Sequence, residues 1–134
     1  MKKIFIDSNV FLRFFTRDDQ GQHERAVDLF RKADDGLIDL VTGPPVLFEI
    51  AWTLRAAYDQ SRERVLDVLS AIVTLKGLEL PDAGLAEEAI RLAKSSGQEF
   101  ADAYIWASAR KTGAEVAAFN KKQFQRLGAK LHSF

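Results

Sequence analysis

The sequence predicts an α/β fold with a mainly parallel sheet, and three observations support this. Short apolar runs of strand type alternate with longer segments in which apolar residues recur at helical spacing. Glycines and prolines separate these segments. Apolar residues make up 47% and charged residues 28% of 134 residues, an ordinary composition for a domain that buries a core. We therefore expect residues 1–134 to form a single domain.

The first half of the chain begins with an expected strand at Ile4–Ile6, a β-favouring run. Asn9–Phe15 has the length of one or two helical turns. Gln22–Ala33 carries apolar residues at helical spacing, and Gly36 lies just beyond its end. Ile38–Val41 is the second expected strand.

The Gly-Pro-Pro run at 43–45 ends that strand and favours a helix start, because proline is tolerated in the first helical turn. Val46–Tyr58 is a strongly apolar helix in this interpretation. Ser61 is a plausible N-cap for the next helix, which extends to about Leu75. Leu78–Leu80 is the third expected strand.

The last third of the chain predicts helices at Leu85–Ala93 and Phe100–Lys111, a strand at Glu115–Phe119 and a short helix at Lys121–Leu127. Residues 130–132 add an edge strand. Strands that alternate with helices indicate an α/β sandwich whose ligand site lies at the carboxyl ends of its strands.

Composition excludes several classes of protein. Lys and Arg total 19, as do Asp and Glu, so a nucleic-acid partner would have to be bound by a local basic patch. The absence of cysteine excludes disulfides, thiolate metal sites and cysteine nucleophiles. No apolar run reaches the roughly 18 residues of a membrane span, and polar residues interrupt the N-terminal apolar stretch as they would not in a secretion signal. We expect a cytoplasmic protein.

Two polar residues follow expected strands. Asp7 ends the first strand, and Asn120 ends the strand at Glu115–Phe119, so both lie where such sheets place chemistry. Each also has an ordinary interpretation, Asp7 as a helix N-cap and Asn120 as a cap or turn residue.

Glu49 stands in the middle of the apolar helix, with three apolar residues on either side. Because the helix is apolar nearly all round, we expect it to be buried. A buried lone carboxylate costs several kcal/mol unless it is paired, protonated or bound to a metal. The alternative to a metal ligand is an ion pair, for which Arg13 is a candidate.

Asp102 lies at the start of the expected helix Phe100–Lys111, and Glu99 falls on the same face. Like charges three residues apart repel in a helix, and a bound cation would reverse that repulsion. The ordinary alternative is that both acids occupy the first helical turn, where the helix dipole favours negative charge.

These residues lie in four segments: IFIDSNVFLR, PVLFEIAWTL, QEFADAYIWASAR and VAAFNKKQF. The four segments resemble, in order, the motifs of PIN domains, specifically the VapC-like toxin ribonucleases of type II toxin–antitoxin systems. The resemblance covers essentially the whole chain. The fourth segment departs from the family pattern, with Ala118 where Thr or Ser is usual and Asn120 where Asp is usual.

The resemblance implies a three-layer α/β/α sandwich and hydrolysis of RNA phosphodiester bonds with Mg²⁺ or Mn²⁺. It implies that Asp7, Glu49 and Asp102 are the catalytic, metal-binding acids, with Glu99 and Asn120 as weaker ligands. Asparagine brings an oxygen ligand without charge, which favours one tightly held metal and a second recruited by substrate.

The family resemblance also implies a homodimer and a cognate VapB-like antitoxin, whose helix would occupy an apolar groove. The apolar cluster Val10–Phe15 is a candidate for part of such an interface. RNA binding would need a basic rim, for which the candidates are Arg13, Arg17, Lys121, Lys122 and Arg126.

Two other functions remain open at this point. The first is a catalytically inactive PIN-like module that binds RNA or protein, which Ala118 and Asn120 favour. The second is a receiver-type or phosphoryl-transfer domain with Asp7 as nucleophile or metal ligand. Such folds usually place a second acid next to that strand end, where this chain has Ser8 and Asn9.

Overall fold

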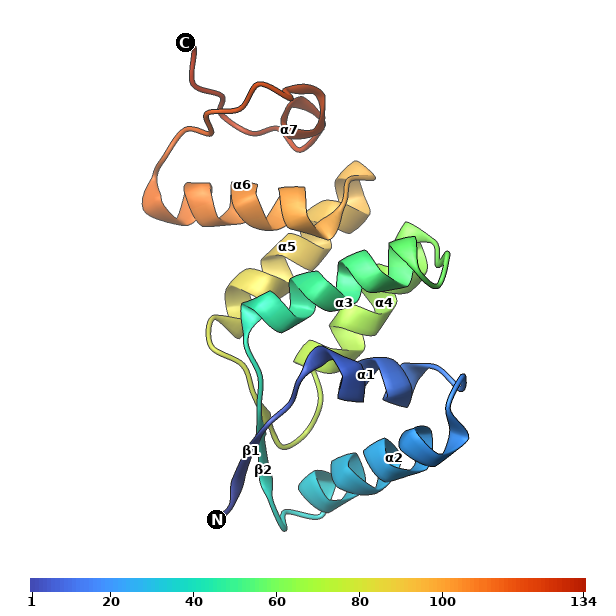
Figure 1. Ribbon diagram of the computed structural model, residues 1–134. Helices are drawn as coiled ribbons and strands as arrows, with labels where there is room; N and C mark the ends of the chain where they lie inside the picture. The colour runs from blue at the N-terminus through green and yellow to red at the C-terminus, as the bar shows by residue number, and fades with distance from the viewer.

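A computed structural model describes all 134 residues and shows a mixed α/β fold with a parallel sheet, as expected (Figure 1). The strands are β1 (Lys3–Phe5), β2 (Asp39–Val41) and β3 (Leu78–Glu79). The helices are α1 (Ser8–Phe15), α2 (Gln20–Asp34), α3 (Pro44–Ala56), α4 (Arg62–Val73), α5 (Ala83–Ser96), α6 (Phe100–Thr112) and α7 (Lys122–Arg126).

The sheet has the order β1-β2-β3, and all its pairs are parallel. Leu40 at its centre is buried and lies opposite Ile4 on one side and Leu78 on the other. Parallel strands cannot be joined by a tight turn and need a longer crossover connection. In this chain each crossover contains two helices. The first crossover is α1 with α2, and the second is α3 with α4.

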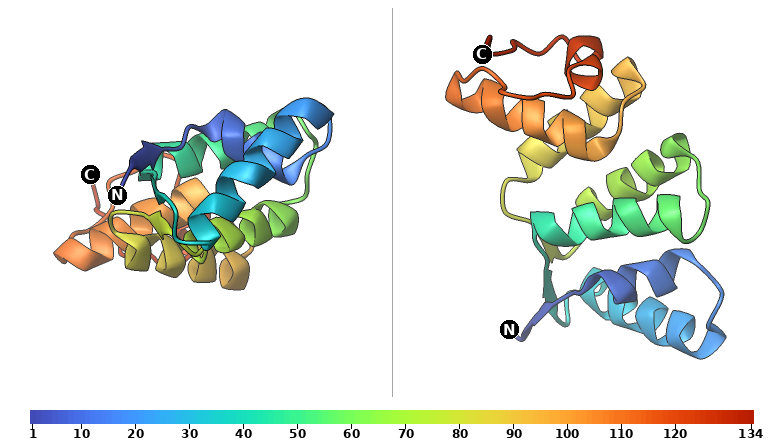
Figure 2. Two further views of the ribbon diagram at one scale, coloured as in Figure 1. Left: turned by 90° about the horizontal axis from the view of Figure 1, so that it is seen from below. Right: turned by 45° about the horizontal axis from the view of Figure 1, so that its top comes forward.

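The helices form pairs that are stacked in chain order, as the right-hand view of Figure 2 shows. The pair α1–α2 packs on the pair α3–α4 through α1 and α3, and α4 packs on α5 of the last pair. One apolar core of 27 buried residues runs through the stack. The N-terminus and β1 lie at one end of the molecule, and the C-terminus lies at the other (Figure 1).

Helix α4 agrees closely with its sequence pattern. The Ser61 side chain accepts a hydrogen bond of 3.1 Å from the Arg64 N–H, so the predicted N-cap is confirmed. The helix then buries one apolar face, comprising Val65, Leu66, Val68, Leu69 and Ile72.

The expected fourth strand at Glu115–Phe119 is wrong as a strand of the main sheet. Only Val116 forms a bridge, a single parallel one to Leu131. The Val116 N–H donates to the Lys130 carbonyl and the His132 N–H donates to the Val116 carbonyl, each at 2.8 Å. Because α6 carries this segment toward the C-terminal end of the molecule, the bridge forms apart from β1 (Figure 1).

No helix is long and apolar enough to cross a bilayer.

Gly77, just before β3, provides a test of the packing between the sheet and α2. Its φ is +83°, and a Cβ there would lie 2.8 Å from the Ala33 carbonyl oxygen. Gly36 has a similar φ of +76° and open space around it. We expect Gly36→Ala to lower the free energy of unfolding by about 1 kcal/mol through backbone strain alone, and Gly77→Ala by about 3 kcal/mol because the clash is added. Urea unfolding of both variants measures this, and equal losses would contradict the packing.

Candidate functional site

Asp7 connects the carboxyl end of β1 to α1. The buried Ile6 fixes this position by donating its N–H to the Val41 carbonyl at 2.7 Å. Asp7 occupies the N-cap position of α1, yet its side chain caps no N–H and forms no ion pair or other hydrogen bond. The N-cap interpretation of its carboxylate is therefore wrong, and the carboxylate is exposed and free.

Glu49 is exposed on α3, so the expectation that it is buried is wrong. Helix α3 buries its other side, with Leu47, Ile50 and Leu54, against the helices next to it. Nothing in the chain covers the side with Glu49, where the Trp52 side chain is 70% exposed. Apolar periodicity showed that α3 has little polar surface, but it did not show how much of that surface is covered.

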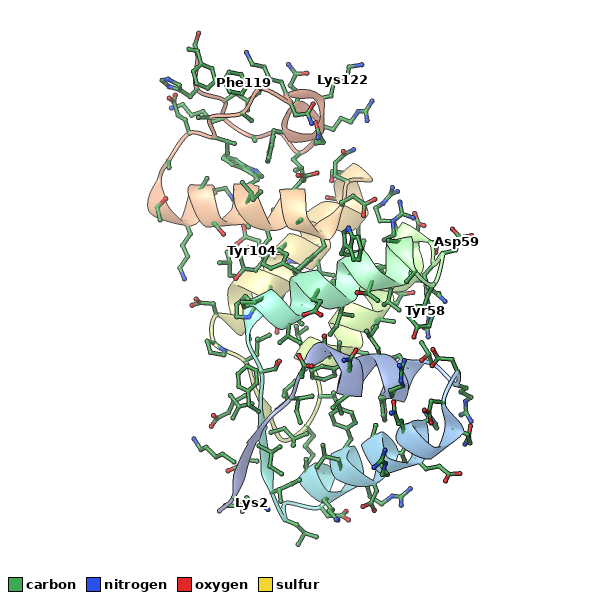
Figure 3. The ribbon with its side chains drawn as sticks, in the orientation of Figure 1. Lys2, Tyr58, Asp59, Tyr104, Phe119 and Lys122 are labelled. Carbon is green, nitrogen blue, oxygen red and sulfur yellow. The ribbon has the colours of Figure 1, made fainter.

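Arg13 is not the partner of Glu49. Its guanidinium donates to Gln22 Oε1 at 2.7 Å and to the Tyr58 hydroxyl at 3.0 Å, and it forms an ion pair with Asp18. The Tyr58 hydroxyl in turn donates to Asp18 Oδ2 at 2.7 Å. Hydrogen bonds from Tyr58 and Thr16, with the charge of Arg13, lower the pKa of Asp18. Arg13 thus connects α1, α2 and the segment after α3, where Figure 3 labels Tyr58.

Asp102 and Glu99 lie together at the start of α6. They line a cleft of about 360 Å³ between α6 and α3, with Trp52 and Arg55 from α3. Arg55 Nη2 donates to Glu99 Oε1 at 2.8 Å, an ion pair that bridges the two helices. The wall of the cleft is aromatic, since the ring of Phe48 packs on those of Phe100 and Tyr104, with centroids 5.4 and 4.9 Å apart.

The pKa of Asp102 is raised above its ordinary value. Burial is the larger cause, and the negative charge of Glu99 adds to it. Asp102 has no hydrogen-bond or ion-pair partner in the chain, whereas Glu99 has Arg55. A cation placed between the two carboxylates would favour their charged forms and reverse this shift.

The side chains suit a hard divalent cation, because Mg²⁺ prefers carboxylate oxygens. Their arrangement in one copy of the chain does not complete a site, since no group of three metal-ligating side chains lies close enough to hold a metal ion. The structure brings together Glu99 and Asp102. It leaves Asp7 at the start of α1, and Asn120 exposed between the Val116 bridge and α7.

The sequence interpretation missed Arg55 as a member of this cleft. Part of its signal was present, because Arg55 follows Trp52 by three residues and residues three apart are neighbours on a helix surface. The contact with α6 is a tertiary feature that spacing alone does not contain.

Asp102→Asn tests the electrostatics of the cleft. A raised pKa means that ionising Asp102 costs more in the folded protein, so its destabilising effect is present at neutral pH and is lost as pH falls toward about 4. Water screens this partly exposed group, so we expect a gain in Tm of only about 1–3 °C at pH 7. The gain should shrink as the pH is lowered. Thermal unfolding at several pH values measures it, with the exposed Glu87→Gln as control; a loss at pH 7 would contradict the assignment.

Comparison with known proteins gives one family. A family model described as PIN domain matches residues 4–130, from the second residue of β1 to the residue before Leu131. No curated protein matches the sequence. The parallel sheet with its helical crossovers is consistent with the α/β/α fold of that family. Since the match includes nearly every residue of the chain, the protein belongs to the PIN domain family, whose members are generally nucleases.

Proposed function

We propose that this protein is a metal-dependent ribonuclease that hydrolyses RNA phosphodiester bonds with Mg²⁺ or Mn²⁺. The observation that carries the proposal is that Asp7, Glu49 and Asp102, from three segments of a PIN domain, have carboxylates without any ion-pair or hydrogen-bond partner in the chain. Such carboxylates are free to take a cation. A divalent ion bound at such a carboxylate would neutralise charge on the phosphate and activate a water.

The cleft beside Asp102 has features that suit a single-stranded RNA. The exposed indole of Trp52 offers a face on which an unpaired base can stack, a contact that tolerates any base. The guanidinium of Arg55 lies in the same cleft, where a phosphate can compete for it with Glu99. These side chains would hold the RNA, and the carboxylates would orient the attacking water.

Exposed basic residues supply the positive charge that an acidic site needs to attract RNA. Arg17, Lys121, Lys122 and Arg126 are exposed and form no ion pair in the chain (Figure 3 labels Lys122). Arg13 contributes less than the sequence suggested, because Asp18 and Tyr58 already engage its guanidinium. We include the four exposed residues in the RNA-binding surface.

The proposal extends to a toxin that acts in the cytoplasm, forms a homodimer and binds a VapB-like antitoxin. A cleft of about 360 Å³ between α1 and α2 is a candidate for the surface that an antitoxin helix would contact; its lining includes the apolar Val10 and Leu29 beside the charged Arg25. Most side chains of the apolar cluster Val10–Phe15 pack within the chain itself. Phe11 and Leu12 are buried, and Phe14 packs edge-on against Phe30.

The second candidate is a catalytically inactive PIN domain that binds RNA or protein. The exposed Asn120 in place of an acid and the incomplete acid cluster of the single chain favour it. The two functions differ in one property, cleavage, since both allow RNA binding.

Cleavage of a fluorescently labelled RNA of mixed sequence with Mn²⁺ distinguishes them. We expect the wild type to cleave, and Asp7→Asn, Glu49→Gln and Asp102→Asn each to lower the rate about 100-fold or more, because each removes a charged metal ligand. Glu87→Gln, an acid on the exposed side of α5, is the matched control and should retain the wild-type rate.

Equal cleavage by the wild type and the three acid variants would reject the assignment of these residues. Binding of the RNA without any cleavage, at saturating Mn²⁺, would favour the inactive binding module.

A further inference from the structure

Two phenylalanine side chains are stacked on the surface at the C-terminal end of the molecule. The rings of Phe119 and Phe134 have centroids 4.8 Å apart and planes that differ by 11°. Phe119 is nevertheless 90% exposed, and Phe134 is 71% exposed. Single exposed apolar residues are ordinary on a protein surface, whereas a contiguous pair of large aromatic rings in water indicates a surface that binds something.

The bridge between Val116 and Leu131 brings the two rings together. Its pairing is parallel, and Phe119 and Phe134 each lie three residues beyond it, so they stand opposite one another. The Val116 N–H holds the bridge by donating to the Lys130 carbonyl at 2.8 Å. The aromatic pair is therefore positioned by the backbone and is already formed before any ligand arrives.

The same segment buries its other large apolar side chains. Val116, Phe124 and Leu127 are buried, and α7 packs on α6. The segment is thus anchored to the body of the protein, while the ring of Phe119 remains exposed at the end of the molecule where Figure 3 labels it. A preformed, anchored surface loses little conformational freedom when it binds a ligand.

Positive charge accompanies the aromatic pair. Residues 113–134 contain one acid, Glu115, and four basic residues, although the whole chain has equal numbers of both: Lys121, Lys122, Arg126 and Lys130. Glu115 is already engaged, by Lys130 at 3.9 Å and by His132 at 3.4 Å. Lys121 and Lys122 are exposed and form no ion pair, and Figure 3 shows Lys122 at the same end of the molecule as Phe119. This local excess of positive charge favours a polyanionic ligand.

We propose that Phe119, Phe134, Lys121 and Lys122 form a C-terminal platform that binds single-stranded RNA. An unpaired base stacks on the open face of Phe119, and the two lysines contact the adjacent phosphates. The platform rests on the proposed function and adds to it a place, outside the cleft of Asp102, where the strand is held. Aromatic faces beside cations bind single strands with little preference for sequence. Apolar area alone would suit a protein partner, so the unpaired lysines are what favours RNA.

Asn120 lies between Phe119 and Lys121 and fits this ligand. Its exposed carboxamide can donate and accept hydrogen bonds, as the edge of a base does. The family pattern usually has Asp at this position, and a carboxylate there would repel the phosphates that the lysines attract. The amide removes that repulsion.

RNA binding in EDTA tests the platform without cleavage, by the fluorescence anisotropy of a labelled single strand of about 12 nucleotides. We expect Phe119→Leu, which keeps an apolar side chain and loses the aromatic face, to lower the affinity about fivefold, and Phe119→Tyr to stay within about twofold of the wild type. Phe5→Ala removes an exposed ring from β1, at the other end of the molecule, and should bind as the wild type does (Figure 1).

Equal affinity of the wild type and Phe119→Leu would overturn the stacking contact and leave the aromatic pair to a protein partner. The same RNA as a duplex should bind about tenfold more weakly, because its bases are paired and stacked on one another. Equal binding of duplex and single strand would also overturn the proposal. Thermal unfolding checks the fold of Phe119→Leu, whose Tm should change by less than about 2 °C because the side chain is 90% exposed.

Salt dependence tests the lysines separately. For a single strand, the logarithm of the binding constant falls against the logarithm of the salt concentration with a slope of about 0.7 per phosphate contact. Lys121→Gln/Lys122→Gln should therefore reduce the slope by about 1.4. Lys2→Gln/Lys76→Gln, at two exposed lysines elsewhere in the chain, is the matched control and should leave the slope unchanged. An equal slope in the two double variants would overturn the phosphate contacts.

These outcomes separate the platform from the ribonuclease function. Weaker RNA binding by Phe119→Leu, beside a wild type that does not cleave with Mn²⁺, would support the platform and reject the ribonuclease. A wild type that cleaves, with equal binding by all the variants, would reject the platform and leave the ribonuclease. Where both are correct, Phe119→Leu should raise KM about fivefold and leave kcat unchanged, because Phe119 holds the strand away from the reacting phosphate.

Discussion

The parallel pairing of β2 with β1 and β3 determines how the chain is arranged around the sheet. It buries Leu40 between Ile4 and Leu78, and it obliges the chain to cross over twice through pairs of helices. Those crossovers determine where the helices begin. Asp7 faces solvent at the start of α1 because β1 ends there, and α3 begins at Pro44 because β2 ends three residues earlier.

Charge is distributed unevenly over this framework. Near the far end of α1, Asp18 is held in its ionised form by Tyr58, Thr16 and Arg13, in a network that fixes three segments of the chain. At the start of α6, Asp102 has only a like charge beside it and is harder to ionise. The first arrangement stabilises the fold. The second is unfavourable by itself, and perturbed groups in a cleft of this kind are typical of sites that act on a ligand.

Much of the fold can be predicted from capping residues and apolar periodicity. The predictions that are wrong concern features that depend on which other elements pack against a segment. Ser61 and the apolar face of α4 agree with the prediction because capping and helical periodicity are properties of a few adjacent residues. Glu49 was expected to be buried, since its helix is apolar nearly all round, and it is exposed because no element covers that side. The strand expected at Glu115–Phe119 is reduced to one bridge, since a strand needs a partner at the right place.

Residue type and short-range spacing were enough to predict the α/β class, the order of the elements as far as α6, and the carboxylates that make a nuclease the function to test. The packing of the folded chain determines that Arg55 pairs with Glu99 and that Arg13 is engaged by Asp18 and Tyr58. It also leaves Asp7 and Asp102 outside any group of three metal-ligating side chains. Arg55 and Glu99 are 44 residues apart in sequence, and Arg13 and Tyr58 are 45 apart, so no local pattern records that these side chains meet.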